Sequence, residues 1–295
     1  MGALRFVVFD LDGVLVDIDS SWEFVHRRFG VNNEENFTKY LKGEIDFKEF
    51  MRSDIRLWGK ASLETIKSIL DSAPIMPGAY EAVRAVKEVG MEPLIVSSGI
   101  SILADRVASE LGINLVYANR LISDMEGRLS GEGEEVVPLN AKDRVLEEVT
   151  KRFNATPRNC ITVGDSQHDI PFFKVSGLSI AFNAKDEQTK QAADVVVDEK
   201  DLRKIIPWIT TNKPNKALIS LKLGRREAEA VAKSLFPDNI KSPPRLYVGT
   251  FIKGDRVIMK VTSLKGVETL LATIDDLLAS AELARRAISI ADSLL

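Results

Sequence analysis

The chain has 295 residues, which suits about two domains, and its 45% apolar and 28% charged residues exclude a disordered, collagen-like or coiled-coil protein. Its net charge of −3 is too small to indicate a nucleic-acid or membrane partner, and no apolar run approaches the roughly 18 residues that a membrane span requires. A single cysteine, Cys160, excludes an internal disulfide and predicts a reducing, cytoplasmic location.

The first two thirds of the chain alternate short apolar runs with helix-like segments. Runs typical of buried parallel strands occupy residues 4–9, 94–97, 160–163, 178–182 and 194–197. Helix-like segments lie between them at residues 80–88, 103–111, 144–152 and 186–192. This alternation predicts an α/β fold with a doubly wound parallel sheet.

Two stretches depart from the alternation. Residues 20–72 have helical apolar spacing, as in Trp22, Val25 and Phe29, directly after the first strand. We therefore expect an inserted helical cap at about residues 18–76. Residues 115–137 carry three glycines between short strand-like pieces and predict a β-hairpin excursion.

Acidic residues follow the predicted strands. Asp10 and Asp12 end the first strand, Ser97 ends the next, and Asp165 and Asp169 follow the strand at 160–163. In open α/β sheets ligands bind beyond the carboxyl ends of the strands, so we expect these side chains to converge. Several carboxylates in one dry pocket require a cation, and hard oxygen ligands favour Mg²⁺.

Four segments carry a family resemblance. DLDGVLVD at 10–17, IVSSG at 95–99, NAKDRVLEEV at 140–149 and GDSQHDIPFF at 164–173 resemble, in order, the four motifs of haloacid-dehalogenase (HAD) superfamily phosphatases. The phosphoserine phosphatase branch is the most similar, and the resemblance covers about residues 4–209. It implies a HAD-like doubly wound sheet and a phosphatase activity.

The resemblance also implies catalytic roles. Asp10 would be the nucleophile that becomes an aspartyl phosphate, and Asp12 would protonate the leaving alcohol and then activate water. Mg²⁺ would be held by Asp10, the backbone carbonyl of Asp12 and Asp165, with Asp169 in support.

Phosphate binding is implied for three further residues. Ser97 and Lys142 would bind the phosphoryl oxygens, and Ser98 is a rival for the role of Ser97. His168 replaces the asparagine of the family's fourth motif. It either lies near the phosphate or faces solvent, and the sequence leaves both open.

The cap residues depart from the phosphoserine phosphatase pattern. The family's acidic residue for the substrate ammonium corresponds to Asp19, but its arginine for the substrate carboxylate falls at Asp54. Arg52 and Arg56 flank Asp54, and a one-turn adjustment would bring either to the substrate. Because an aspartate repels a carboxylate, we predict that phosphoserine is not the best substrate. We expect His26, beside two arginines, on the surface.

A change in charge marks a second domain. Residues 214–295 carry a net +4 and the rest a net −7, with a polar, proline-containing stretch at the break. We therefore expect domains at 1–212 and 213–295. Residues 216–223 suit a strand, 225–236 a helix ended by Pro237, 245–252 and 256–261 a hairpin, and 267–294 a long helix. This order predicts a small α+β (β-α-β-β-α) domain: a three-stranded antiparallel sheet with two helices on one face.

The long helix has two apolar stripes. One comprises Val267, Leu270, Ile274, Leu277, Ala281, Ile288 and Leu295 and would cover the sheet. The other comprises Leu283, Ala287, Ile290 and Leu294 and predicts a partner helix, or docking on the first domain.

Residues 215–290 resemble the Pcc subunit of KEOPS, the complex that makes threonylcarbamoyladenosine in tRNA. The resemblance rests on REAEAVAKSLFPDN, KGDRVIMKV and ETLLATIDDLLASAELA. It implies a non-catalytic domain that forms a homodimer and contacts the KEOPS catalytic subunit, with tRNA only an indirect partner.

The sequence thus predicts a Mg²⁺-dependent phosphomonoesterase that acts on a small phosphorylated metabolite and dimerises through its C-terminal domain. Two alternatives remain open. One is a KEOPS-associated assembly subunit with an accessory HAD domain, and the other is a phosphotransferase in which an alcohol replaces water.

Overall fold

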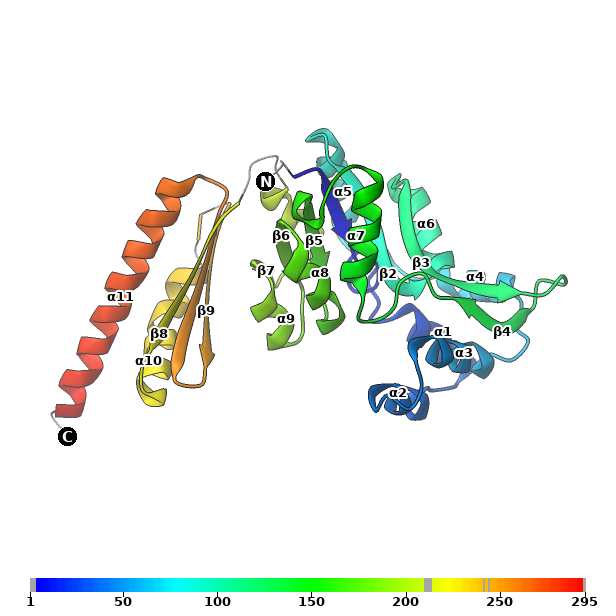
Figure 1. The fold of residues 1–295 in the computed structure, drawn as a ribbon, viewed down its shortest axis with the longest axis horizontal. Helices are drawn as coiled ribbons and strands as arrows, with labels where there is room; N and C mark the ends of the chain where they lie inside the picture. The colour runs from blue at the N-terminus through cyan, green and yellow to red at the C-terminus, as the bar shows by residue number, and fades with distance from the viewer. Residues whose placement is uncertain (1–3, 210–213, 241, 244, 294–295) are drawn as a thin grey trace.

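The computed structural model describes residues 4–209, 214–240, 242–243 and 245–293, which form two sheets (Figure 1). The large sheet has the order β4-β3-β2-β1-β5-β6-β7, and all neighbours are parallel except β3 and β4. Its strands are β1 (Phe6–Phe9), β2 (Glu92–Ile100), β3 (Leu115–Ser123), β4 (Leu129–Glu134), β5 (Cys160–Gly164), β6 (Leu178–Phe182) and β7 (Val195–Val197). The predicted doubly wound α/β architecture is confirmed.

The central strand β1 shows why the sheet is covered on both sides. All four of its residues are buried, and they alternate between two core clusters. Val7 and Phe9 belong to one cluster and Phe6 and Val8 to the other, because successive side chains of a strand point to opposite faces. The helices that flank the sheet are α5 (Ala79–Glu88), α6 (Ser101–Leu111), α7 (Lys142–Arg152), α8 (Ile170–Val175) and α9 (Glu187–Ala192).

The register of the central strands builds one polar edge. Phe9 of β1 is paired with Ile95 of β2 and with Val163 of β5. The residues that follow these positions therefore emerge side by side. Among them are Asp10, Ser97 and Asp165.

Between β1 and α5 the chain forms four helices, as expected of the cap. They are α1 (Ser21–Phe29), α2 (Glu34–Leu41), α3 (Phe47–Leu57) and α4 (Leu63–Leu70). Three of these helices have an N-cap residue whose side-chain oxygen accepts the backbone N–H three residues ahead. These residues are Ser20, Asp46 and Ser62. The cap packs against the β3–β4 hairpin through α3. That hairpin is more than the predicted excursion, because β3 first pairs in parallel with β2 from Leu115 to Tyr117.

The C-terminal residues form the predicted β-α-β-β-α unit. Its elements are β8 (Asn215–Lys222), α10 (Arg225–Ile240), β9 (Leu246–Lys253), β10 (Arg256–Ser263) and α11 (Val267–Ser293). The small sheet is antiparallel with the order β8-β10-β9, and both helices share one core with it, on one face. The predicted end of the first helix at Phe236 is wrong, since α10 continues through Pro237 to Ile240. A proline lacks the N–H donor and its ring crowds the carbonyl four residues earlier, but the residues after it can still donate to the preceding turn.

Helix α11 uses most of its predicted core stripe. Leu270, Leu277 and Ala281 are buried against the small sheet. Val267 is 54% exposed, contrary to expectation, because it is the first residue of the helix and lies beyond the core. In the second stripe Leu283 is 71% exposed. The side chains of Ile290, Leu294 and Leu295 lie outside the described residues.

The two sheets are joined by polar contacts. The Thr262 hydroxyl donates to the backbone carbonyl of Asp194 at 2.9 Å, and the Lys260 ammonium donates to that of Ala193 at 2.9 Å. Leu264 and Tyr247 also pack against the core of the large sheet. The predicted boundary at 212–213 falls among residues 210–213, outside the described part. Among the helices described, none has the length and apolar character needed to cross a bilayer.

Candidate active site

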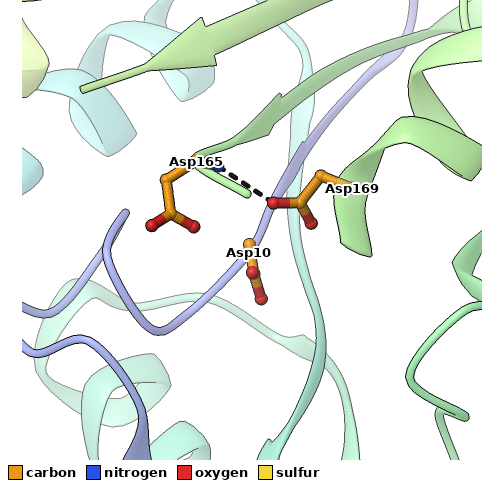
Figure 2. Close-up of side chains that lie close together, drawn as sticks. All are labelled: Asp10, Asp165 and Asp169. Carbon is orange, nitrogen blue, oxygen red and sulfur yellow. Dashed lines mark hydrogen bonds between the residues drawn. The ribbon is translucent and has the colours of Figure 1, made fainter. Parts of the chain in front are cut away.

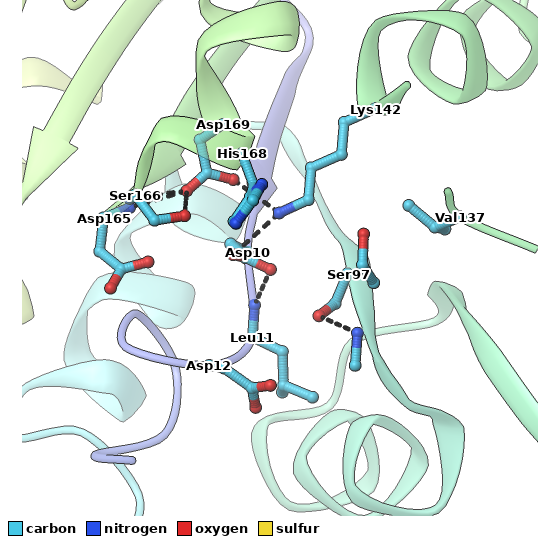
Figure 3. Close-up of polar contacts among 12 residues, drawn as sticks. Asp10, Leu11, Asp12, Ser97, Val137, Lys142, Asp165, Ser166, His168 and Asp169 are labelled. Carbon is cyan, nitrogen blue, oxygen red and sulfur yellow. Dashed lines mark hydrogen bonds and ion pairs between the residues drawn. The ribbon is translucent and has the colours of Figure 1, made fainter. Parts of the chain in front are cut away.

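Asp10 lies at the polar edge of the large sheet, directly after β1. Its Oδ1 accepts the Leu11 backbone N–H at 2.7 Å, and its Oδ2 lies 2.8 Å from the Lys142 Nζ (Figure 3). Only 6% of the residue is exposed. The main chain and the first residue of α7 thus hold this carboxylate in a fixed orientation.

Asp10, Asp165 and Asp169 form a compact acidic cluster. Each offers an oxygen within 4.8 Å of the others (Figure 2). Both Asp169 oxygens are already occupied: Oδ2 accepts the backbone N–H groups of Asp165 and Ser166 at 2.9 and 3.0 Å, and Oδ1 accepts Lys142 at 2.6 Å. The Asp165 carboxylate accepts no hydrogen bond from the described residues. Asp165 is therefore the member most open to a cation, and each Asp10 oxygen, which has a single partner, keeps a second lone pair for one.

The electrostatics of the cluster fit a cation. Burial raises the pKa of Asp10 to about 6 although Lys142 opposes the shift, and burial together with Asp169 raises the pKa of Asp165 well above its usual value. Burial alone would lower the pKa of Lys142, but Asp10 and Asp169 outweigh it and raise that pKa. One ammonium does not balance three carboxylates, so a divalent cation would relieve the remaining repulsion.

Gly13 leaves room for this cluster. It has a φ of +75°, and a Cβ atom there would lie 2.2 Å from the Asp165 Oδ2. A side chain at this position would both strain the backbone and displace the carboxylate.

The two oxygens of Asp12 have unequal surroundings. Oδ2 accepts both the backbone N–H and the hydroxyl of Ser21, each at 2.8 Å, while Oδ1 is buried with no hydrogen-bond partner in the described structure. Burial raises the pKa of Asp12 to about 6. Sequence reasoning missed Ser21, whose only signal was its place at the start of the cap helices.

Ser97 and Ser98 differ in what their hydroxyls do. The Ser97 Oγ accepts the Gly99 backbone N–H at 3.0 Å, whereas the Ser98 hydroxyl donates to the Pro138 carbonyl at 3.3 Å. Both residues are buried and line the same cavity as Asp10. The Ser97 proton is thus the one with no acceptor in the described chain.

His168 lines this cavity too. Its Nδ1 lies 3.0 Å from the Asn140 Oδ1, and burial, followed by the nearby Lys142 charge, lowers its pKa. A neutral imidazole at the cavity wall is therefore favoured near neutral pH.

The cavity has a volume of about 270 Å³ and extends from the acidic cluster to the cap. The cap contributes apolar and aromatic residues and polar residues in equal number. These residues are Asp19, Ser20, Trp22, Glu23, Asn33, Phe37, Phe47, Phe50, Met51 and Asp54. The cavity thus lies between the cap and the polar edge of the large sheet, as is typical of a ligand-binding site.

Of the three cap residues predicted to bind the substrate, Asp19 lines the cavity, whereas Arg52 and Arg56 do not. Asp19 forms an ion pair with Lys185, which lowers the pKa of its carboxyl. Arg52 and Arg56 lie elsewhere and pair with Glu49 and Glu132. Residues two apart on a helix point about 200° apart. Because Asp54 faces the cavity, Arg52 and Arg56 point to the opposite side of α3.

The prediction that His26 lies on the surface is wrong. The residue is 2% exposed and accepts the Trp58 indole N–H at 2.8 Å through its Nδ1. Trp58 is buried in the core and stacks on Trp22 with ring centroids 5.5 Å apart.

Comparison with known proteins identifies the family. The model for haloacid dehalogenase-like hydrolases matches residues 4–177. The chain belongs to this family.

Individual HAD relatives agree with the match. The phosphoserine phosphatase of Methanocaldococcus jannaschii is 32% identical over 70% of this chain and 97% of its own length. That of Archaeoglobus fulgidus is 33% identical over 67% of this chain, which spans 58% of that relative. A solved phosphoserine phosphatase with a phospho-aspartyl intermediate analogue is 30% identical, with a TM-score of 0.61 over 70% of this chain and 99% of that one. The protein is a phosphatase of the HAD superfamily, similar to the phosphoserine phosphatases.

Proposed function

We propose that this protein hydrolyses the phosphomonoesters of small metabolites through an aspartyl phosphate on Asp10, with Mg²⁺ as cofactor. The observation that carries the proposal is the Asp10 carboxylate, held 2.8 Å from the Lys142 ammonium in the cavity that Asp12 also lines. Phosphoryl transfer needs mainly positioning and charge neutralisation, and this floor offers both.

The reaction divides between two aspartates. An Asp10 oxygen attacks phosphorus, the bond to the leaving alcohol breaks, and Asp12 gives that alcohol a proton. Asp12 then takes a proton from water, which attacks the aspartyl phosphate, releases inorganic phosphate and restores Asp10. A pKa of about 6 suits Asp12 to both transfers, because it lies near the working pH.

Asp10, Asp165 and the Asp12 carbonyl would hold Mg²⁺, and Asp169 would support them through its hydrogen bonds to the Asp165 and Ser166 backbone. When bound, the cation neutralises charge on the phosphoryl oxygens. Lys142 and the Ser97 hydroxyl would bind those oxygens, and we favour Ser97 over Ser98 because the Ser98 proton is already donated to Pro138.

Phosphoserine is the first substrate to consider, since it gives the relatives their name. The cavity argues against a strong preference for it. Asp54 lines the wall and would repel a carboxylate, while Arg52 and Arg56 are paired outside. A kcat/KM for phosphoserine tenfold or more above that for every other substrate would contradict this.

A substrate screen tests the proposal. The purified protein would be assayed for phosphate release with and without Mg²⁺ on phosphoserine, sugar phosphates, phosphoglycolate and nucleotides. We expect Mg²⁺-dependent release from at least one class. No release from any, or equal rates in a chelator, would overturn it.

We further propose that residues 213–295 form a dimerisation domain. β8 is an edge of the small sheet, and Leu283 is 71% exposed on α11. Unpaired edges invite pairing with another chain, and two-fold pairing is the commonest closed solution. Light scattering of the full chain and of a form ending at Asn212 tests this. A full chain that stays monomeric at tens of micromolar, or a shortened form that dimerises equally well, would contradict it.

The resemblance to the KEOPS Pcc subunit supports a further partner for this domain. We propose contact with the KEOPS catalytic subunit, with tRNA only an indirect partner because a net +4 is weak. Leu283→Asp, with binding to that subunit as the readout, tests whether the exposed face of α11 is the contact. A single buried cysteine, Cys160, supports a cytoplasmic location for the whole assembly.

A further inference from the structure

The cap end of the cavity contains a charged group that the proposed reaction does not use. Asp54, on α3, is 2% exposed and lines the cavity wall. Its Oδ2 accepts the Asn33 side-chain N–H at 2.9 Å, and its Oδ1 has no hydrogen-bond partner in the described structure. A buried carboxylate with one unsatisfied oxygen is costly, so a donor from a ligand would stabilise it.

The neighbouring histidine does not neutralise Asp54. The His26 Nε2 lies 3.5 Å from the Asp54 Oδ2, but the His26 Nδ1 accepts the Trp58 indole N–H at 2.8 Å. An indole nitrogen only donates, so Nδ1 carries a lone pair and the single ring proton is on Nε2. That Nε2 has no hydrogen-bond partner in the described structure, so the Asp54 carboxylate accepts no hydrogen bond from His26.

No arginine or lysine of the described chain forms an ion pair with Asp54 either. Arg52 and Arg56, on the same helix, pair with Glu49 and Glu132. The other two acidic cap residues at the cavity are each paired with a basic side chain, Asp19 with Lys185 and Glu23 with Arg27. Asp54 is thus a carboxylate at the cap end of the cavity that has no ion-pair partner among the lysines and arginines of the described chain.

The side chains beside Asp54 indicate what kind of ligand would supply such a partner. Phe50 and Met51 line the cavity from the same helix as Asp54, and Phe37 lies against Phe50 with ring centroids 5.8 Å apart. Apolar side chains beside one unpaired acidic group suit an aliphatic chain that ends in an ammonium, which offers three donors and a positive charge. A carboxylate on the same chain would meet Asp54 and be repelled.

We propose that Asp54 binds the ammonium group of the substrate, so that the enzyme acts on phosphomonoesters whose alcohol carries an amino group and no carboxylate. This inference rests on the proposed phosphomonoesterase activity and names the substrate class of that site. Asn33 positions the Asp54 carboxylate through its Oδ2, and the free Oδ1 receives the ligand.

A matched series of substrates tests the proposal. Straight-chain ω-aminoalkyl phosphates of two to five carbons would be compared with n-alkyl phosphates of equal length and with phosphoserine. For the best chain length we expect kcat/KM to favour the amino compound by about tenfold or more. In Asp54→Asn that ratio should fall to within about threefold, because the amide keeps the shape and removes the charge. Glu49→Gln, on the outer side of α3, is the matched control and should keep the wild-type ratio.

Binding measurements separate this inference from the activity on which it rests. An enzyme that hydrolyses n-alkyl and amino compounds equally well would overturn the inference and leave the phosphatase proposal intact. If no phosphate ester is hydrolysed, the phosphatase proposal fails instead. Calorimetry of an aminoalkyl and an n-alkyl phosphate on the Asp10→Asn protein then decides: tenfold tighter binding of the amine supports the role of Asp54, and equal affinities overturn it. The ratio of kcat/KM for the amino and n-alkyl compounds in the wild-type enzyme is itself a test. The proposal can therefore be contradicted even if Asp54→Asn does not fold.

Discussion

The two oxygens of the Asp12 carboxylate differ in their hydrogen bonding, and Ser21 accounts for the difference. Ser21 donates twice to Oδ2, and its Oγ also accepts the Ile100 backbone N–H at 3.1 Å, which ties the cap to β2. Oδ1 has no hydrogen-bond partner in the described structure, which leaves it free for the proposed proton transfer. In the proposed mechanism Ser21 is thus a positioning residue for Asp12.

We predict that Ser21→Ala lowers kcat on alkyl phosphates about ten- to a hundredfold, because a misaligned Asp12 protonates the leaving oxygen poorly. The loss on p-nitrophenyl phosphate should be much smaller, since p-nitrophenolate leaves with little need of a proton. Ser21→Thr, which keeps the hydroxyl, is the control. Equal losses on both substrates would show that Ser21 only stabilises the fold.

The acidic cluster gives a second prediction at this scale. Burial raises the pKa of Asp10 and Asp12 to about 6, so the folded state binds protons more tightly than the unfolded state between about pH 4 and 6. Without metal, this contribution to stability is present in full below pH 4 and is lost as the pH rises through 6. Mg²⁺ needs the deprotonated carboxylates, so its stabilising effect should follow the opposite trend.

We therefore expect saturating Mg²⁺ to raise Tm by several degrees at pH 7.5 and by much less at pH 5. Differential scanning fluorimetry with and without a chelator measures this, and Asp165→Asn should abolish the difference. An equal rise in Tm at both pH values would contradict the assignment of the cluster as a cation site.

At the scale of helices and strands, the sequence predicted well where the elements lie along the chain. It predicted poorly which side of each cap helix is buried. The strand runs are unbroken apolar segments between polar turns, so β1, β5 and β6 were placed within two residues. Asp10, Ser97 and Asp165 converge because parallel strands end at one edge, and Lys142 reaches them from the first residue of α7. Which face α1 and α3 turn inward depends on tertiary packing, and the burial of His26 and the outward turn of Arg52 were therefore missed.

The packing of α1 against α3 offers a test of this interior. Trp58, directly after α3, donates its indole N–H to the buried Nδ1 of His26 on α1. Trp58→Phe would leave that nitrogen without a donor, at a cost of about 1–3 kcal/mol in the free energy of unfolding. Urea denaturation measures the change. A loss below about 0.5 kcal/mol would mean that the hydrogen bond does not hold the two cap helices together.

At the scale of the whole molecule, the C-terminal unit is attached to the phosphatase fold by more than the chain. Leu264, which follows β10, is 3% exposed and belongs to the core of the large sheet. The Lys216 ammonium pairs with Asp194, whose backbone carbonyl accepts the Thr262 hydroxyl. These contacts lie beside β7, away from the residues that line the catalytic cavity.

We predict that Leu264→Ala lowers the free energy of unfolding by about 2–5 kcal/mol, as expected for a buried leucine. Leu218→Ala, on the same small sheet but 66% exposed, is the matched control and should change it by less than about 0.5 kcal/mol. Denaturation followed by tryptophan fluorescence reports on the phosphatase core. Equal effects of the two substitutions would show that the C-terminal unit does not share that core.

The most direct test of the whole account is the activity of Asp10→Asn on p-nitrophenyl phosphate in the presence of Mg²⁺. An amide cannot supply the attacking oxygen anion, and it weakens the proposed cation site. We predict a loss of roughly a thousandfold or more in kcat, with an unchanged circular dichroism spectrum. Turnover within about tenfold of the wild-type rate would contradict Asp10 as the nucleophile and, with it, the aspartyl-phosphate mechanism.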